Sequence, residues 1–526
     1  MRDFHSPGRS TARSTRAMAA TSQPAATLAA IEVLRAGGNA VDAAVAACAV
    51  LCVVEPESTG IGGDCFCLYA PAGTGKVIAL NGSGHAPQAA TADWYRERGI
   101  AALPDMTPHA VTVPGAIDAW TRLVADHGRK GLDELLQPAI RYAEEGFAVH
   151  GRVALDWEAE ADKLNRDEAA ARLFGRPLAE GTRFVQKELG RTLRLIAEGG
   201  RDAFYTGEIA EDIVGHLRAK GGLHTLDDFA AQRCEYVEPI ATDYRGYTVH
   251  ECPPNGVGVI ALLMLNLLEG YDPAPGGPLS VTRLHRLIEA TRLAYRDRNA
   301  FVADPRMSDV PVQHLLDKGY AAALRGHLRD DAAMADLPPP GLPPHEDTVY
   351  LCVVDEDGNA CSFINSLFKS FGSGIMAPRS GVLLQNRGLG FVLDPDHPNC
   401  IAPRKRPMHT IIPGMLTKGG EAVMPFGVMG GHYQPVGHSW LLTSILDYGL
   451  DPQAGIDLAR LFAFEGLVEV ERGIGSETCE ALTRLGHSLK PIDKPHGGGQ
   501  AIWIDRARGT LAGGSDPRKD GLALGY

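Results

Sequence analysis

A stretch dense in proline, residues 336–347, interrupts the chain and constrains what can form on either side of it. Proline lacks a backbone N–H and fixes φ, so this stretch can be neither a helix nor a central strand. Two runs with alternating apolar residues follow at once, 348–354 and 360–367, and the short polar segment 355–359 joins them. This spacing predicts a β-hairpin. An exposed linker is therefore expected to lead directly into a hairpin whose first residue is Thr348.

The junction between Asp347 and Thr348 has a chemical use. Cleavage of the peptide bond before Thr348 would place an α-amino group and a hydroxyl on the same residue. An α-amino group has a pKa of about 7.7–8.0, so near neutral pH it can act as the general base for its own side-chain oxygen. Threonine also begins many ordinary strands, so the local pattern by itself favours an inert Thr348.

Helical and strand-like segments come in blocks along the chain rather than in strict alternation. Blocks of this kind favour stacked sheets with helices on the outside over a Rossmann or barrel plan. Apolar spacing and turn residues define the individual elements. The expected helices are residues 24–36, 40–54, 132–145, 192–198, 209–220, 279–301 and 439–448, and the expected strands outside the hairpin are 65–70, 76–80, 381–384, 421–428 and 500–504.

Charge and motif content limit the expected partners. The chain has 51 Lys and Arg against 64 Asp and Glu, a net charge of −13, which argues against nucleic acid or an anionic membrane as a partner. The basic cluster Arg9, Arg13 and Arg16 is expected to be a frayed, solvated end. With neither a secretory signal pattern nor a bilayer-length apolar run in the sequence, we expect a cytoplasmic protein. Metal and cofactor motifs are also missing, so we expect neither, and we interpret Cys65 and Cys67 as buried free thiols.

Nearly the whole chain resembles the γ-glutamyltranspeptidases, which are N-terminal-nucleophile (Ntn) hydrolases that process themselves. Segment 348–359 resembles the start of that family's small subunit. Further matches occur in the family's order at 36–44, 60–64, 113–116, 136–139, 371–374, 405–407, 430–431 and 514–518. The resemblance implies an α+β fold of the αββα sandwich type, with two stacked sheets flanked by helices. It also implies a precursor cut between Asp347 and Thr348 into a large chain, 1–347, and a small chain, 348–526, that stay interlocked in one globular unit.

The same resemblance implies roles for individual residues. Thr348 matches the nucleophile, with its α-amine as the base, and Ser366 falls where the family has a threonine that contacts the nucleophile. Gly430 and Gly431 match the backbone amides of the oxyanion hole, where a Cβ would hinder the close approach that such donors need. The implied reaction is amide hydrolysis through an acyl ester on Thr348, with water or another amine as the acceptor.

Four recognition features, at five positions, differ from the family pattern. The family's arginine for the glutamyl α-carboxylate corresponds to Ala92, its carboxylate for the substrate amine to Gly390, and a carboxamide to Phe368. Its paired serines become His409 and Thr410. Each lost contact to a charged group typically costs about 2 kcal/mol or more, so we expect glutathione to be a poor substrate.

Segments 363–368 and 386–391 more closely resemble the branch that contains oxamate amidohydrolase, an enzyme that hydrolyses a very small acidic amide. Arg387 is new relative to the transpeptidase pattern, where a glutamine is usual. It either anchors the substrate carboxylate or is a structural arginine paired with Asp394 or Asp396. The candidate substrate-binding residues are Arg387, His409, Thr410, Phe368 and Asn386.

Three functions therefore stay open. The first is a hydrolase of small, oxamate-like acidic amides, and the second is a glutathione hydrolase or γ-glutamyltransferase with altered glutamyl recognition. The third is a homologue that never matures and serves as a binding or structural protein, against which the retention of Thr348, Ser366 and the two glycines speaks. The expected partners are a small-molecule amide and the two chains of one precursor, and a homodimer is left open.

Overall fold

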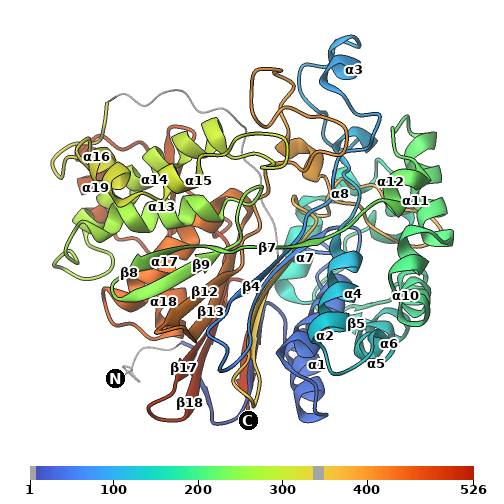
Figure 1. Cartoon of the computed structure of the whole chain (residues 1–526), viewed down its shortest axis with the longest axis horizontal. Helices are drawn as coiled ribbons and strands as arrows, with labels where there is room; N and C mark the ends of the chain where they lie inside the picture. Colours follow the sequence, from blue (N-terminus) through green and yellow to red (C-terminus); the bar gives the residue numbers. More distant parts are fainter. Residues whose placement is uncertain (1–7, 336–348) are drawn as a thin grey trace.

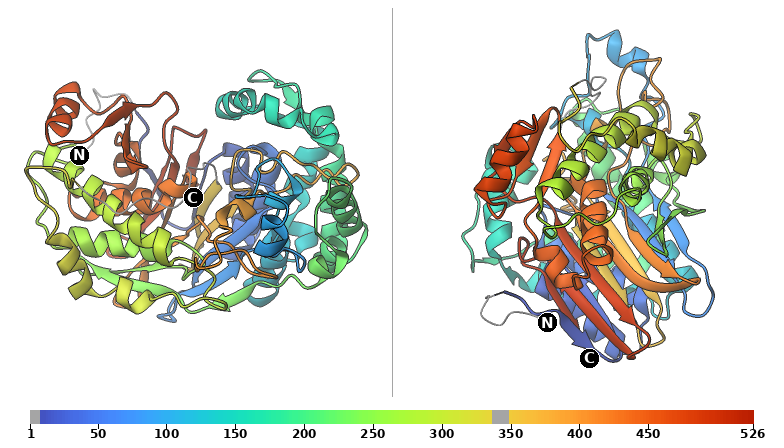
Figure 2. Two further views of the ribbon diagram at one scale, coloured as in Figure 1. Left: turned by 90° about the horizontal axis from the view of Figure 1, so that it is seen from above. Right: turned by 90° about the vertical axis from the view of Figure 1, so that its left-hand side faces the viewer.

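Two seven-stranded sheets are stacked at the centre of the protein, and helices cover the outer face of each (Figure 1). The computed structural model describes residues 8–335 and 349–526, so Asp347, Thr348 and the proline-rich stretch lie outside the described residues. Seen from above, the layers follow one another as helices, sheet, sheet and helices (Figure 2). The architecture is the expected α+β sandwich of αββα type.

The first sheet contains the expected hairpin. Its strands β10 and β11 pair antiparallel, with Val349 opposite Asn365. All its neighbouring strands are antiparallel. In spatial order the strands are β19 (Leu522–Gly525), β2 (Met18–Thr21), β10 (Val349–Val354), β11 (Ala360–Ser366), β3 (Asp64–Ala70), β4 (Ile78–Gly82) and β7 (Glu235–Val237).

The second sheet contains the two later strands that the sequence predicts, as β13 and β17. In spatial order its strands are β1 (Ala12–Ser14), β18 (Thr510–Ser515), β17 (Gly498–Asp505), β13 (Glu421–Met429), β12 (Gly414–Lys418), β9 (Tyr247–Glu251) and β8 (Ile240–Tyr244). Two minor sheets lie apart from the sandwich. They are formed by β14 (Leu461–Phe464), β15 (Leu467–Val470) and β16 (Leu489–Pro491), and by β5 (Phe147–Ala148) with β6 (Arg183–Phe184).

Helices of the N-terminal half cover the first sheet, and later helices cover the second (Figure 1). Every residue of α2 is buried, and Asn39 with Asp42 forms a capping box at its start, which explains a helix this apolar beginning so sharply. The helices on the side of the first sheet are α1 (Pro24–Arg35), α2 (Ala40–Val54), α4 (Ala116–His127), α5 (Leu132–Leu135), α6 (Gln137–Glu145), α7 (Gly151–Ala159), α8 (Ala161–Leu164), α9 (Glu168–Phe174), α10 (Lys187–Tyr205), α11 (Glu208–Ala219) and α12 (Leu226–Ala230). The helices on the side of the second sheet are α13 (Gly258–Glu269), α14 (Val281–Phe301), α15 (Val312–Leu315), α16 (Lys318–Arg325), α17 (Gln434–Leu446), α18 (Pro452–Asp457) and α19 (Ser476–Arg484).

The interface between the two sheets is mostly apolar, with the buried hydroxyls of Tyr350 and Ser362 hydrogen-bonded to each other at 2.8 Å. Met18, Phe66, Tyr350 and Ile364 of the first sheet are buried in one cluster with residues of the second sheet. Gly427 of β13 fits because the Tyr350 ring lies over it: a Cβ at that position would come within 2.4 Å of the ring. Every residue of β10 and β11 is buried, since each strand has helices on one face and the other sheet on the opposite face.

Two sequence expectations about secondary structure were wrong. The helix expected over 132–145 is two helices, α5 and α6, because Pro138 in the first turn of α6 restarts the chain there. The strand expected over 381–384 is absent from the described structure, where Leu383 and Leu384 form only isolated bridges and Gly381 has a φ of +67°. Cys65 and Cys67 are free and buried, as expected.

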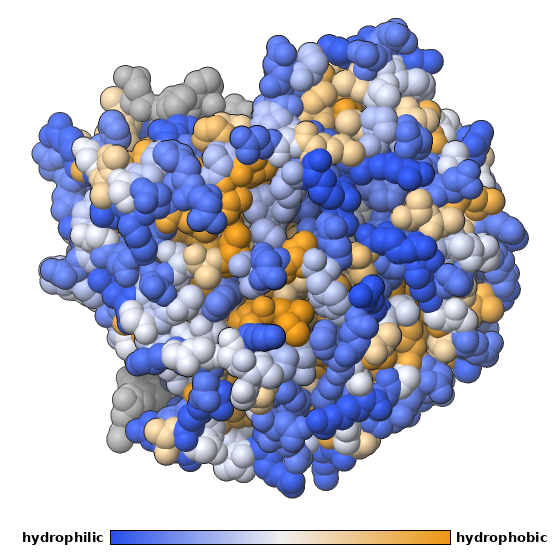
Figure 3. Space-filling model, in the orientation of Figure 1, coloured by the Kyte–Doolittle hydropathy of each residue, from blue (hydrophilic) through white to orange (hydrophobic). Residues whose placement is uncertain are grey.

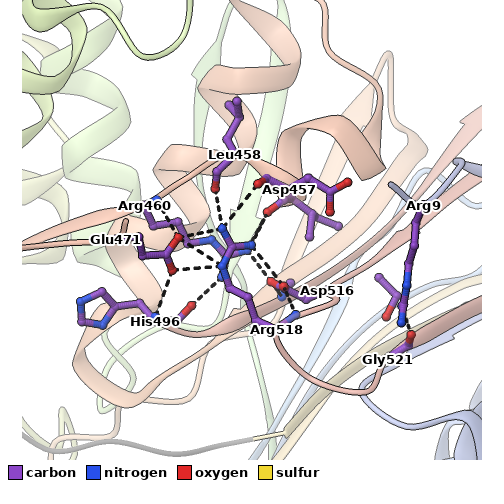
Figure 4. A network of polar contacts seen from close by, with 12 residues as sticks. Arg9, Asp457, Leu458, Arg460, Glu471, His496, Asp516, Arg518 and Gly521 are labelled. Atoms are coloured by element: carbon purple, nitrogen blue, oxygen red, sulfur yellow. Dashed lines mark hydrogen bonds and ion pairs between the residues drawn. The ribbon is translucent and has the colours of Figure 1, made fainter. Parts of the chain in front are cut away.

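The basic cluster near the start of the chain is not a frayed end. Arg13 belongs to β1, Arg16 forms an ion pair with Glu356 at 2.8 Å, and Arg9 donates a hydrogen bond to the carbonyl of Gly521 (Figure 4). The sequence alone could not show this, because the partners lie hundreds of residues away.

A buried ionic network stabilises the end of the chain. Asp516 is completely buried and pairs with Arg460 and Arg518, and Arg518 also pairs with Glu471 at 2.7 Å (Figure 4). On the face shown in Figure 3, hydrophilic side chains predominate and hydrophobic ones gather in separate small areas. Within the described ranges, no helix has both the length and the apolar character needed to cross a membrane.

Candidate active site

Ser366, the last residue of β11, lies where three segments of the chain meet. It is completely buried, and its hydroxyl oxygen accepts a hydrogen bond from the Phe368 amide at 2.8 Å. The same oxygen lies 3.1 Å from Nη2 of Arg387, which donates to it. Because Val349 pairs with Asn365, Ser366 lies beside the start of the strand that follows Thr348.

Arg387 is held from several sides. Its Nη1 donates to the Thr410 hydroxyl at 2.7 Å, and its Cζ lies 4.2 Å from the centroid of the Phe368 ring. The side chain is completely buried, and its Nε has no hydrogen-bond partner among the described residues. Across the same residues its nitrogens donate to Thr410 and Ser366 and form no ion pair with Asp394 or Asp396, so the structural pairing that the sequence left open is not formed.

Burial lowers the pKa of Arg387 to about 9, and the negative charge of Asp64 works in the opposite direction. The guanidinium is therefore a cation at neutral pH. A buried cation with an unused donor is costly unless an anion or a polar ligand satisfies it. This arrangement suits the binding of a substrate carboxylate.

His409 is a neutral spacer rather than a second cation. Its Nε2 lies 2.9 Å from Oδ2 of Asp64, and the Ile411 amide donates to its Nδ1 at 3.4 Å. These partners place the proton of the neutral ring on Nε2. Burial, reinforced by the charge of Arg387, lowers the pKa of His409 to about 4. Both ring nitrogens are thus engaged inside the protein.

Asn386 orders the loop that carries Phe368. Its side-chain oxygen accepts from the Lys369 amide at 3.1 Å, and its side-chain nitrogen donates to Asp105 at 2.9 Å. Lys369 in turn pairs with Asp105 at 2.8 Å. Phe368 itself has a φ of +84°, in the left-handed region that non-glycine residues rarely adopt. Backbone strain of this kind gathers at functional sites, and here it places the ring over Arg387.

The glycine pair at the end of β13 directly precedes His432, a neighbour of Phe368. Gly430 and Gly431 have φ values of +118° and +54°, and a Cβ at Gly430 would lie 3.0 Å from the backbone of Gly497. His432, the next residue, has its ring centroid 6.3 Å from that of Phe368, edge to face. The structure thus brings Ser366, Phe368, Arg387, His409 and Thr410 into one cluster and the two glycines to its edge, whereas Thr348 lies outside the described residues.

A cavity of about 550 Å³ is separated from this cluster by His432, which contacts Phe368 of the cluster and Phe464 of the cavity wall. Its wall includes Phe464, whose ring stacks on His432 with centroids 5.5 Å apart. This volume is in the range of small-molecule sites. The lining combines aromatic rings with cations and apolar groups, among them Tyr295, Phe464, Arg292, Arg296, His487 and Leu467.

Sequence reasoning missed Asp64 as a separate functional candidate. Asp64 entered the sequence analysis only as the last residue of the glycine-rich segment 60–64 that resembles the family. The contact that reveals it is the hydrogen bond between its carboxylate and His409. Their separation of 345 residues hides that pairing from any local pattern.

Comparison with known proteins assigns the chain. The family model for gamma-glutamyltranspeptidase matches residues 26–526. The chain belongs to the γ-glutamyltranspeptidase family. Like other members, it is an N-terminal-nucleophile hydrolase that cleaves amides with a threonine nucleophile.

Individual members of the family agree over almost their full length. The glutathione hydrolase-like YwrD proenzyme of Bacillus subtilis is 41% identical over 506 residues, which cover 94% of this chain and 95% of that protein. The oxamate amidohydrolase proenzyme of Klebsiella pneumoniae is 34% identical over 530 residues, covering 98% of this chain and 99% of that protein. The crystal structure of a cephalosporin acylase from Bacillus halodurans has a TM-score of 0.93 at 41% identity, covering 100% of this chain and 99% of that one.

Proposed function

We propose that this γ-glutamyltranspeptidase-family hydrolase is a self-processing amidohydrolase of small, oxamate-like acidic amides, acting through an acyl ester on Thr348. One observation carries the proposal: the buried guanidinium of Arg387 lies 3.1 Å from the Ser366 hydroxyl. In the family, the residue at the position of Ser366 contacts the nucleophile. An anion held by Arg387 is therefore expected only a few atoms from the carbonyl under attack.

The short distance between an anion bound at Arg387 and the reacting carbonyl favours a short acyl group. In oxamate the carboxylate is bonded directly to the amide carbonyl, so one cation beside the nucleophile can bind it. A γ-glutamyl group instead carries its charged α-carboxylate and α-amine several bonds from the reacting carbonyl. At Gly390, where the family has its carboxylate for that amine, a Cβ would come within 2.7 Å of the Met408 carbonyl, so a larger side chain has no room without a backbone shift.

The proposed mechanism uses groups of this chain alone. Cleavage before Thr348 exposes its α-amine, which takes the proton of the Thr348 hydroxyl as that oxygen attacks the amide carbon. The amides of Gly430 and Gly431 stabilise the oxyanion, where each such donor is typically worth about 3 kcal/mol. The C–N bond then breaks, and ammonia leaves with the proton from the α-ammonium. Water attacks the ester with the same amine as base, which releases oxalate and restores Thr348.

The variant Arg387→Met tests this function with oxamate as substrate. Loss of one partner of a desolvated charge pair costs about 2–5 kcal/mol, so kcat/KM should fall roughly 30- to 5,000-fold, mostly through a higher KM. Arg283→Met is the matched control, because Arg283 is also a buried arginine stacked on an aromatic ring, with its Cζ 4.4 Å from the centroid of Trp440. An Arg387→Met enzyme that matures and keeps the wild-type KM would refute the proposal.

The cavity beside Phe464 favours a second candidate, an acylase for amides with a larger amine part. Its aromatic and cationic lining suits an amine that carries a ring and a negative charge. The similarity to a cephalosporin acylase supports this reading. Oxamate and N-phenyloxamate share one acyl group and differ only in the leaving amine, so their kcat/KM values separate the two candidates. A preference of about tenfold or more for the anilide would favour the acylase.

A further inference from the structure

The carboxylate of Asp64 joins four segments that lie far apart in the sequence. Its Oδ1 accepts from the Gly115 amide at 3.0 Å and from Nε2 of Gln385 at 2.9 Å. Its Oδ2 accepts from Nε2 of His409 at 2.9 Å. Asp64 is completely buried, so these contacts define its position.

We propose that Asp64 is a positioning residue for substrate specificity, which aims Arg387 and balances its charge without occupying the donor that the substrate needs. The inference rests on the proposed function, in which Arg387 binds the carboxylate of the acyl group. It goes further by naming a residue that forms no hydrogen bond or ion pair with Arg387 in the described part of the chain and yet sets the preference for anionic substrates.

Two partners of Asp64 connect directly to the hold on Arg387. Gln385 lies two residues before Arg387 on the same segment. His409 directly precedes Thr410, whose hydroxyl accepts a hydrogen bond from Nη1 of Arg387 at 2.7 Å. The backbone segment that carries Arg387 and the Thr410 hydroxyl that accepts its hydrogen bond are therefore both linked to the Asp64 carboxylate. A shift of Asp64 would displace both together, and small displacements of a binding group are costly in rate.

The electrostatic role follows from what surrounds the guanidinium. Among the described residues Asp64 raises the pKa of Arg387, whereas burial lowers it. The other titratable groups nearby do not replace it: His409 is neutral, Arg406 is itself a cation, and Asp105 is paired with Lys369. The α-amine proposed for Thr348 adds no negative charge either.

The spacing between the two charges leaves the arginine available. Within the described ranges Asp64 forms no ion pair with Arg387, so it acts through space and takes none of the guanidinium donors. Nε of Arg387 stays without a partner there. A direct ion pair between Asp64 and Arg387 would have used the paired guanidinium N–H donors that bind a carboxylate. Asp64 thus keeps Arg387 charged and the site open for an anion.

The test compares Asp64→Asn with wild type on oxamate and on pyruvamide, its neutral analogue of nearly the same shape. Asparagine keeps the size of Asp64 and removes its charge. We expect the KM for oxamate to rise roughly 10- to 100-fold, as for other residues that orient a ligand-binding side chain, and the KM for pyruvamide to change less than about twofold. Without Asp64 the pKa of Arg387 falls, so the alkaline limb of kcat/KM for oxamate should move to lower pH.

The matched control is Glu251→Gln. Glu251 is an equally buried carboxylate at the end of β9 in the other sheet, and it pairs at 2.6 Å with a histidine, His438 of α17. It tests whether losing any buried carboxylate–histidine pair changes KM. We expect an unchanged oxamate KM and an unchanged alkaline limb, and a change like that of Asp64→Asn would overturn the proposal.

A second variant keeps the proposal testable if Asp64→Asn fails to fold. Gln385→Leu removes one partner of Asp64 but keeps its charge, so the oxamate KM should rise while the alkaline limb stays at its wild-type pH. A wild-type KM in Gln385→Leu would overturn the positioning role. If Arg387→Met raises the KM and Asp64→Asn does not, this inference fails and the proposed function stands. If Arg387→Met has no effect, the proposed function fails first.

Discussion

The Phe368 ring lies against the guanidinium of Arg387, 4.2 Å from centroid to Cζ, and reaches this place with a left-handed backbone at φ +84°. The family has a carboxamide at this position, which would hydrogen-bond a glutamyl group. Here an aromatic face covers a cation instead. A position that helps to hold the glutamyl group in the family pattern contributes here to the packing around Arg387.

The variant Phe368→Leu should weaken that hold without removing the charge. A desolvated cation–π contact is worth about 0.5–2 kcal/mol, so the KM for oxamate should rise roughly 2- to 30-fold while maturation proceeds as in wild type. Steady-state kinetics give the result. Phe464→Leu, which removes the ring behind His432 and does not touch Arg387, is the control, and an equal effect of both variants would contradict the contact's role.

Self-processing should be visible on a denaturing gel. Purified wild-type protein should resolve into two chains without added protease, and N-terminal sequencing of the smaller one should begin at Thr348. Thr348→Ala should stay a single chain of 526 residues, because it lacks the hydroxyl that attacks the preceding bond. Wild-type protein that stays intact after prolonged incubation would favour the non-catalytic alternative.

Oxamate should be turned over far faster than γ-glutamyl anilides. The positions matching the family's glutamyl contacts are Ala92, Gly390 and Phe368, and none of these residues has a charged or carboxamide side chain. Two missing charged contacts at about 2 kcal/mol each predict a preference of roughly 1,000-fold in kcat/KM. A γ-glutamyl substrate that performs as well as oxamate would show that recognition has been rebuilt by other residues.

Stability should fall in acid through Asp156. This buried carboxylate of α7 pairs with Arg152 at 2.8 Å, Lys494 at 3.1 Å and Lys519 at 3.5 Å. Burial opposes its ionisation, but these three cations together outweigh it and lower the pKa of Asp156 to about 2. The pKa of Asp156 is thus depressed in the folded state. Its ion pairs therefore stabilise the fold at pH values above its ordinary pKa of about 3.9, and this stabilisation is lost as the pH falls through 2.

Linkage gives this group about 2 kcal/mol of stability at neutral pH. Asp156→Asn should therefore lower the melting temperature at pH 7, and its difference from wild type should shrink as the pH approaches 2. Thermal melts across that range measure it. A difference that stays constant between pH 7 and pH 2 would show that the loss is one of packing and not of charge.

The sequence predicted most of the fold where local signals were strong. The hairpin of β10 and β11 followed from alternation and a polar turn, and α2 from an apolar run with an Asn cap. The short strands β1 and β2 were missed because three or four residues carry no period of their own. They form only because strands from the other end of the chain pair with them.

The site was predictable only where the family pattern reaches. Ser366, Phe368, Arg387 and Thr410 were expected near one another, and their contacts now give this a geometry. The role of His409 could not be read from sequence, because it depends on a carboxylate 345 positions earlier. Burial, which decides whether that ring is charged, is a property of the whole fold.

The order of strands in the first sheet has a consequence for the mature enzyme. The neighbours β19, β2 and β10 come alternately from after, before and after the proposed cut, and β11 from after it pairs with β3 from before it. The two products would thus share an unbroken hydrogen-bonded sheet, like two halves of a split protein. Dilution could not part them, so specific activity should not depend on enzyme concentration, and neither half made alone should fold.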